Sequence, residues 1–443
     1  MRLCAEWLAV GVVAALVAGC GGGGSSSGGG GGTGGGNGGG GGTATTVTVN
    51  FKGQTPTAVA TQVGTGAFAT VTPAATVTLS LPSGTTKFAV AYVCPAVTLT
   101  VGMALSQVTN QNVLEATTRD GTSFNAVCGA ASGSGTTGVL TFSVDASAIT
   151  GASEVSVQAE NSQYYAQAPF GVTTTGATLN APAGTDRVDI QTYNISGSGA
   201  GYVLATSAVK SFTGQAVPGA LNGGNPVVLG AEDLVTTQPV TFNGLPVGYG
   251  TPFVVADFLP SGVAAGLLLT DGQSNNYSVP PASVTQGGGM YDVQVEAIAT
   301  PNATGAVSVL QRFATAGPVT VNFPVAWSYA GPTAAANPTF DFSSYTGFAG
   351  KSGVSQTGEI SWQTGTGAQS TYTVKASASY QGSSSTVTLP NLSGLTGFLP
   401  QPASGTSLAW AAAELQSDAG TIQSASGAAT VNTVLAQGSF TMP

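Results

Sequence analysis

Residues able to do chemistry are few in this chain, and histidine is absent from all 443 positions. Without histidine there is no Ser-His-Asp triad, the commonest general base is missing, and most zinc and copper sites cannot form. The four cysteines are Cys4, Cys20, Cys94 and Cys128. We expect Cys94 and Cys128 to form a disulfide, because they are an even pair whose spacing is unlike C-x-x-C. The alternatives are a redox pair, a metal site or two separate buried thiols.

Carboxylates are the second source of chemistry, because hydrolysis of a glycosidic bond requires only two of them. Asp186 lies in the turn-like "AGTDRV", with Arg187 beside it for pairing. Asp292 and Glu296 alternate with valines, as a solvated strand face does. The other candidates are Asp189, Glu232, Asp233, Asp257 and Asp341. We favour a surface or turn role for all of them, since most carboxylates are solvated, and predict no catalytic residue, metal site or cofactor.

The N-terminus has the order of a secretion signal. Arg2 precedes an apolar run from Leu8 to Val17, which is too short for a stable membrane anchor and suits a signal-peptide core. The run ends in Val17-Ala18-Gly19-Cys20, which resembles the bacterial lipobox. The resemblance implies removal of residues 1–19 and lipidation of Cys20. Because Gly21 and not Asp follows the cysteine, it also implies a lipid-anchored place in the cell envelope, at the outer membrane or cell surface.

Residues 20–43 are almost all Gly, Ser and Thr after the cysteine, so we expect a flexible tether. The body, residues 44–443, is hydrophobic enough for a sizeable core. The whole chain has a net charge of −9 with only 6% charged residues. This composition argues against nucleic-acid binding, which needs basic patches. The membrane, reached through Cys20, is the one partner that the sequence predicts; a protein or carbohydrate ligand stays unidentified.

The body is predicted to be all-β. Short alternating or β-branched runs such as "KFAVAYV" and "RVDIQTY" are separated by Gly, Pro, Asn-Gly and Asp-Gly turns. The Asp120-Gly121 turn predicts a hairpin that pairs Val113–Thr118 with Ser123–Val127. Trp327, Trp362 and Trp410 could stack on sugars, but packing in a β core is the commoner role.

Two phrases recur with a period of about 100 residues, which indicates internal repeats. "TLSLPSGTTKF" at Thr78 returns as "TLNAPAGTDRV" at Thr178, with fainter copies from Tyr277 and Ser385. The second phrase, of the type "VTFNGLP", occurs near 47, 140, 240 and 338. We place the repeat units at about 47–138, 139–238, 239–337 and 338–443. A β-propeller of about eight blades is slightly preferred to four tandem immunoglobulin-like β-sandwiches.

Together these features predict a lipid-anchored envelope protein with a structural or binding role, and we favour a role without catalysis. One alternative is a propeller-type hydrolase or lyase that uses carboxylates as acid and base. Two or more carboxylates that converge on one place would favour it. Another alternative is an adhesion or assembly module of stacked sandwiches.

Overall fold

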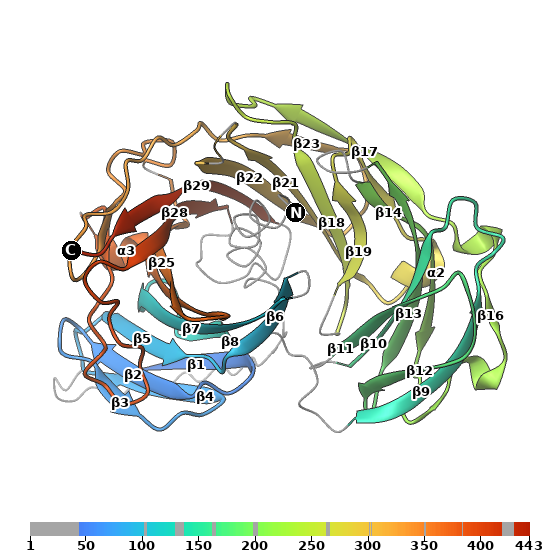
Figure 1. Ribbon diagram of the computed structural model, residues 1–443, viewed down its shortest axis with the longest axis horizontal. Helices are drawn as coiled ribbons and strands as arrows, with labels where there is room; N and C mark the ends of the chain where they lie inside the picture. Colours follow the sequence, from blue (N-terminus) through green and yellow to red (C-terminus); the bar gives the residue numbers. More distant parts are fainter. Residues whose placement is uncertain are drawn as a thin grey trace, which may run out of the picture. The chain divides into compact units, whose positions relative to one another are not determined.

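The computed structural model describes residues 44–101, 104–128, 137–161, 165–197, 203–262, 266–300, 302, 304–349, 351–382, 384–418 and 429–443. This part of the chain is nearly all β, as predicted (Figure 1). Its helices are single turns: η2 (Leu221–Gly224), η3 (Ala231–Asp233), α2 (Ala282–Thr285) and α3 (Ala378–Gln381). Within these ranges no helix has the length and apolar character needed to cross a membrane. The predicted signal peptide and tether, with Cys20, lie outside the described residues.

The described chain divides into two compact units. Unit 1 comprises described residues within 44–128, 327–418 and 435–443. Unit 2 comprises those within 137–326 and 429–434. The last strand, β29 (Ala429–Thr441), begins in unit 2 and ends in unit 1.

The first part of unit 1 has two sheets. In the small sheet, β1 (Thr45–Gly53) pairs antiparallel with β4 (Thr76–Leu81) and parallel with β8 (Ser123–Cys128). In the large sheet the antiparallel pairs are β3–β2, β2–β5, β5–β7 and β6–β7. Their bounds are β2 (Ala58–Val63), β3 (Ala69–Val71), β5 (Lys87–Val93), β6 (Val97–Val101) and β7 (Ala104–Thr117).

Alternation in the sequence explains how these two sheets meet. In β4 the apolar Val77, Leu79 and Leu81 are buried and the residues between them are exposed. They join a core cluster with Phe88 and Phe124, which come from the large and small sheets and contact edge to face. Burial of each such Val, Leu or Phe contributes about 1.5–3 kcal/mol, so this core holds the two layers together.

The second part of unit 1 extends the same large sheet. β26 (Ala368–Ser377) pairs parallel with β7 and antiparallel with β25 (Val354–Gly365), which pairs antiparallel with β28 (Ser407–Ser417). The small sheet here is β24 (Thr339–Asp341) with β27 (Thr386–Thr388). Phe340 of β24 lies against Gly358 of β25, where a Cβ would come within 2.5 Å of the ring. Glycine is therefore required at this close approach.

The first part of unit 2 repeats this arrangement. The small sheet contains β9 (Thr137–Asp145), β12 (Thr173–Pro182), β15 (Gly219–Ala220) and β16 (Val227–Val228). The large-sheet strands are β10 (Glu154–Glu160), β11 (Tyr165–Phe170), β13 (Arg187–Ser196) and β14 (Val203–Thr213). A second core cluster joins the layers through residues such as Leu140 of β9 and Ile190 of β13.

The second part of unit 2 has the same two layers. The small-sheet strand β17 (Thr236–Asn243) pairs antiparallel with β20 (Asn276–Val279) and parallel with β23 (Val319–Asn322). The large-sheet strands are β18 (Phe253–Pro260), β19 (Leu267–Gly272), β21 (Gly289–Ile298) and β22 (Gly305–Phe313). β19 also pairs with β14, so one large sheet runs through both parts of unit 2.

The strands formed by the two recurring phrases pair with each other. They form the antiparallel pairs β1–β4, β9–β12, β17–β20 and β24–β27, one in each part. The proposed repeat boundaries, the propeller and the immunoglobulin-like sandwiches stay predictions.

The predicted hairpin after Asp120 is wrong. β8 leaves the large sheet and pairs parallel with β1, so that it does not return along β7. The physical reason is that Phe124, Ala126 and Cys128 complete the core between the two sheets, which a hairpin strand beside β7 could not do. An Asp-Gly turn favours reversal of the chain but does not specify which sheet receives the next strand.

Candidate functional site

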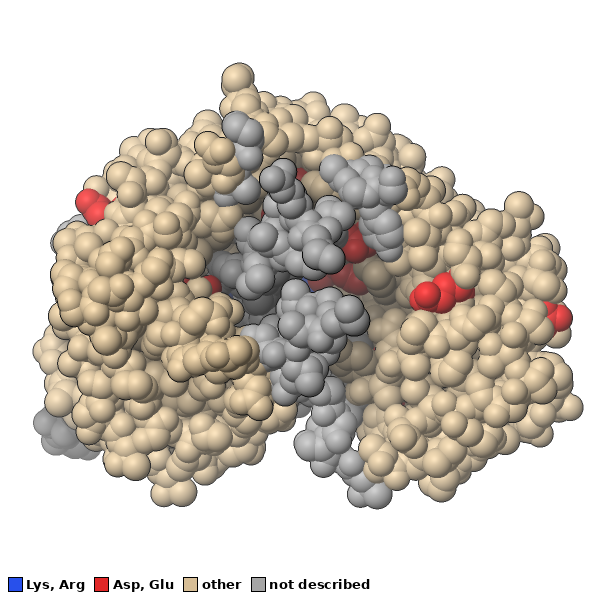
Figure 2. Space-filling model, viewed as in Figure 1, with Lys and Arg blue, Asp and Glu red and all other residues tan. Residues whose placement is uncertain are grey.

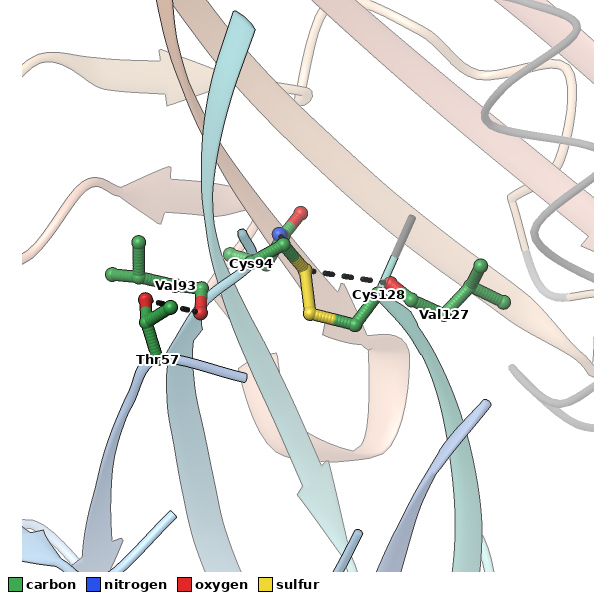
Figure 3. The surroundings of a disulfide bond; sticks show 6 residues. Thr57, Val93, Cys94, Val127 and Cys128 are labelled. Atoms are coloured by element: carbon green, nitrogen blue, oxygen red, sulfur yellow. Dashed lines mark hydrogen bonds between the residues drawn. A yellow bond between two sulfur atoms is a disulfide. The ribbon is translucent and has the colours of Figure 1, made fainter. Parts of the chain in front are cut away.

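Cys94 and Cys128 form the predicted disulfide (Figure 3). Cys94 follows β5 of the large sheet and Cys128 ends β8 of the small sheet, with Cα atoms 5.2 Å apart. Both residues are buried. The Thr57 hydroxyl donates to the Val93 carbonyl 3.2 Å away, beside the bridge. The bond thus links the two layers of unit 1 covalently, which is a structural role.

Arg187 and Asp189 form a buried ion pair in unit 2. Arg187 Nε lies 2.7 Å from Asp189 Oδ2, and the Ser211 hydroxyl also donates to this carboxylate. Arg187 Nη2 donates to the Val284 carbonyl 3.3 Å away, which ties β13 to α2. The expected pairing of Arg187 with Asp186 is therefore wrong, because alternation along β13 puts Arg187 and Asp189 on one face.

Other candidate carboxylates stabilise turns, as the sequence indicated. Asp233 Oδ2 accepts from the Gly230 amide and from Lys210 Nζ, each at 3.0 Å, at the start of η3. The neighbouring Glu232 side chain is 74% exposed. Asp341 accepts from the Ser343 amide at 2.8 Å, and this bond lowers its pKa. Glu232 Oε1 lies 3.8 Å from the same Lys210 Nζ, so this lysine is shared by two neighbouring carboxylates.

A polar row crosses three strands of the large sheet in unit 2. Asp257 of β18 lies directly opposite Asp292 of β21, which lies opposite Arg312 of β22. Arg312 Nε donates to Asp292 Oδ1 at 2.6 Å, and Nη2 donates to Oδ2, so the pair is bidentate. Two carboxylates opposite each other repel, and Arg312 neutralises one of them.

The second polar position on β21 is Gln294, whose Nε2 donates to the Ser308 hydroxyl at 3.1 Å. The third is Glu296, which we had placed on a solvated face. That expectation is wrong for Glu296, which is only 6% exposed. Its Oε1 has no hydrogen-bond partner within the described ranges. An unpaired buried polar atom is costly, so this carboxyl favours its protonated form.

The electrostatics of this face follow from burial. Burial, with the nearby charges of Asp292 and Asp271, raises the pKa of Asp257 to about 7. Burial raises the pKa of Glu296 to about 7. Both groups therefore hold a proton for part of the time near neutral pH. The sequence signal for this site was the alternation "DVQVE", in which every second residue is polar.

The same Asp-x-Gln spacing occurs in β13, as Asp189 and Gln191. Both are fully buried, and Gln191 Nε2 donates to the Leu268 carbonyl at 3.0 Å. In β13 the motif is thus committed to internal contacts. In β21, Asp292 and Gln294 are half-buried and reach the surface.

Unit 1 contains a polar cluster that sequence reasoning missed. Asp120 Oδ2 accepts from the Thr117 amide and hydroxyl at 2.8 and 3.0 Å, and from the hydroxyls of Ser377 and Ser379 at 2.7 and 2.5 Å. These bonds tie α3 to the end of β7. No local signal could reveal them, because Asp120 and Ser379 are 259 positions apart.

The three tryptophans of the body are buried, each at most 7% exposed, which confirms their predicted packing role. Trp362 and Tyr372 line a cavity of about 20 Å³ in unit 1, together with Leu389, Pro390 and Leu399. That volume holds about one water molecule, so the cavity is not a ligand site.

Charge is sparse elsewhere. Figure 2 shows a face on which Lys, Arg, Asp and Glu side chains are few among uncharged residues. Within the described ranges no group of three or more His, Cys, Asp or Glu residues could hold a metal ion. The partly buried polar face of β18, β21 and β22 is therefore the strongest candidate for a functional site.

Comparisons with known proteins add little to this description of an all-β protein with a polar sheet face. No protein-family model matches the chain, and no curated protein matches it. A crystal structure of a putative adhesin from Bacteroides ovatus ATCC 8483 is similar at 12% sequence identity. The similarity covers 43% of this chain and 90% of that chain, with a TM-score of 0.16.

Proposed function

We propose that this chain is a lipid-anchored protein of the bacterial cell envelope whose all-β body has a binding role at the cell surface. The observation that carries the binding role is the partly buried polar face of β18, β21 and β22 on an otherwise charge-poor body. The buried disulfide between Cys94 and Cys128 supports the location, since such bonds persist in oxidising compartments outside the cytoplasm.

Anchoring follows from the lipobox-like Val17–Cys20. Several acyl chains on Cys20 would attach the protein stably, and the tether would hold the body away from the membrane. Replacement of Cys20 by Ser should move the protein out of the membrane fraction. Cys4→Ser is the matched control, because Cys4 lies in the predicted signal and should have no effect. Membrane association of Cys20→Ser at the wild-type level would contradict the anchor.

Surface display is tested separately. An antibody against the body should label intact cells that produce the wild-type chain. Labelling that requires permeabilised cells would contradict display at the surface while leaving the anchor intact.

For the architecture, we infer that the repeat of about 100 residues is a sandwich and not a pair of propeller blades. The support is that strands of each phrase pair lie in a small sheet that packs on a large sheet, with core residues from both layers. A propeller blade is a single sheet instead. Small-angle scattering tests the alternative, because a closed body of about 400 residues should have a radius of gyration of roughly 21–22 Å. An elongated row of sandwiches would exceed it clearly.

A second candidate function is that of a hydrolase or lyase that uses acid–base chemistry. It is favoured by Asp257 and Asp292, which lie directly opposite each other on neighbouring strands. Asp257, which is partly protonated near pH 7, would act as general acid, and Asp292, which accepts from Arg312, as base or nucleophile. Release of reducing ends from polysaccharides, abolished by Asp257→Asn, would establish this activity. Absence of turnover on any substrate that the protein binds would exclude it.

A further inference from the structure

The polar face of unit 2 has a composition that selects among ligand classes. Strand alternation places Phe253, Asp257, Asp292, Gln294, Glu296 and Arg312 on one face of β18, β21 and β22. We call these six residues the β21 face. The opposite face carries Val293 and Val295, which are fully buried toward the core.

The β21 face offers both donors and acceptors with little net charge. Arg312 and Asp292 neutralise each other through their bidentate contact. Gln294 brings an amide, which has donors and acceptors at once. Asp257 and Glu296 donate a hydrogen bond when protonated and accept when ionised. This balance fits hydroxyl groups, which also donate and accept, better than it fits an ion.

Glu296 independently indicates a missing partner. Its side chain is more than nine-tenths buried on the same face, and its Oε1 has no partner within the described ranges. A buried polar atom left unsatisfied costs about 1–3 kcal/mol. A rotation of the Glu296 side chain toward the surface would let a ligand hydroxyl bind this oxygen and remove that cost.

Phe253 supplies an apolar surface in the same row. It lies directly opposite Glu296 in the register of β18 and β21 and is half-buried. An aromatic ring beside a few convergent polar groups is the usual composition of a site for a small organic molecule. A sugar ring has both an apolar C–H face and polar edges, and so matches this pairing.

We propose that the β21 face binds an uncharged glycan, with Phe253 against a sugar ring and Gln294, Glu296 and the Asp292–Arg312 pair on its hydroxyls. The proposal rests on the proposed binding function. Anionic polymers fit poorly, because the one arginine of this face is already paired with Asp292 and the chain is acidic overall. A metal-bridged ligand fits poorly because the described residues provide no group of metal ligands.

The test is calorimetric titration of the full-length, detergent-solubilised protein with neutral glucan, mannan and galactan oligosaccharides, and with polygalacturonate as an anionic probe. At least one neutral oligosaccharide should bind. Phe253→Ala and Gln294→Leu should each weaken that binding by about tenfold or more, since a lost hydrogen bond or stacking contact is of that size. The matched control is Glu359→Gln on β25 of unit 1, which should leave affinity unchanged.

Thermal unfolding of each variant separates loss of the site from loss of the fold. Binding of polygalacturonate alone, binding of no neutral oligosaccharide, or binding unaffected by both Phe253→Ala and Gln294→Leu would overturn the proposal. Labelling of intact cells by antibody is read in parallel. If labelling persists while neutral oligosaccharides fail to bind, the glycan inference is wrong and surface display is untouched.

Discussion

Strand β21 of unit 2 and strand β28 of unit 1 hold matching places in their sheets but differ in side chains. β21 follows the small-sheet strand β20, and β28 follows the small-sheet strand β27. Each pairs antiparallel with the first large-sheet strand of its part, which is β18 for β21 and β25 for β28. On the face away from the small sheet, β21 carries Asp292, Gln294 and Glu296. On its corresponding face β28 carries Ala409, Ala411 and Ala413.

The difference shows that the fold does not require polar side chains on this strand. Alanines occupy these positions of β28, while the polar Thr357 and Glu359 of β25 lie opposite Ala413 and Ala411. In unit 2 the polar side chains bring a like-charge opposition of Asp257 and Asp292 and an unsatisfied Glu296 oxygen, both of which reduce stability. We infer that unit 1 is mainly scaffold, whereas unit 2 combines scaffold and site. The following predictions separate the two roles.

The largest expected effect is on unit 2 through its buried ion pair. Arg187→Met should lower the free energy of unfolding by about 3–5 kcal/mol, because it leaves the buried Asp189 carboxylate without its counterion. Arg119→Met, at an exposed position of unit 1, is the control and should change stability by less than about 0.5 kcal/mol. Equal effects of the two variants, measured by urea unfolding, would show that the Arg187 pair is dispensable.

The disulfide should matter most to unit 1. Replacing both Cys94 and Cys128 by Ala should destabilise unit 1 by about 3–4 kcal/mol, since the bridge closes a loop with a sequence separation of 34. Amide exchange resolves the units, and faster exchange is expected in β1, β5 and β8 but not in β13 or β18. Uniform loss of protection in both units would contradict the assignment of the bond to unit 1 alone.

Asp120 tests how α3 is held against β7. Asp120→Ala removes an acceptor of four hydrogen bonds and should destabilise unit 1 by about 2–3 kcal/mol. Asp341→Ala is the comparison, because that carboxylate accepts in an exposed turn and should cost less than about 1 kcal/mol. Thermal unfolding that ranks Asp341→Ala as the more harmful change would refute this account of the cluster.

The smallest effect concerns pH. Burial raises the pKa of Glu296 from 4.5 to about 7, so the folded protein binds a proton that the unfolded chain releases between these values. The contribution of this group to stability is complete below about pH 4.5 and is lost as pH rises through about 7. Glu296→Gln should therefore stabilise unit 2 at pH 8 relative to wild type, by about 1–2 kcal/mol, and much less at pH 5.

The matched control is Glu232→Gln, the same substitution at a side chain that is 74% exposed, which should change stability by less than about 0.5 kcal/mol. Melting temperatures of both variants at pH 5 and pH 8 provide the comparison. If the difference in melting temperature between Glu296→Gln and the wild-type protein is the same at pH 5 and pH 8, this carboxyl does not titrate as burial requires.

The sequence predicted much of the fold because alternation and repetition are local signals. The all-β class and the strands of both phrases were accessible in this way, and the bond between Cys94 and Cys128 followed from the number and spacing of the cysteines. The sheet that each strand joins was not, as the parallel pairing of β8 with β1 shows. Period-two alternation describes a face but does not say what covers it, and for that reason Glu296 was placed in solvent.

Long-range contacts explain the remaining failures. β7 and β26 are adjacent strands of one sheet although about 260 residues separate them, and Asp120 meets Ser379 across the same distance. Asp257 faces Asp292 only because β18 and β21 align in one particular register. Nothing in the spacing of these residues specifies that register, since a shift of one residue would turn every side chain of the strand to the other face.

Grafting the alanine face of β28 onto β21 tests the division between scaffold and site most directly. In the variant Asp292→Ala, Gln294→Ala, Glu296→Ala, the affinity for the neutral oligosaccharide bound by the wild-type protein is measured by calorimetry, and folding is followed by circular dichroism. We predict a cooperatively folded protein in which binding is weakened by about 100-fold or more, because at least two hydrogen-bonding side chains of the site are gone. A folded triple variant that binds the oligosaccharide with wild-type affinity would contradict the assignment of the site to unit 2.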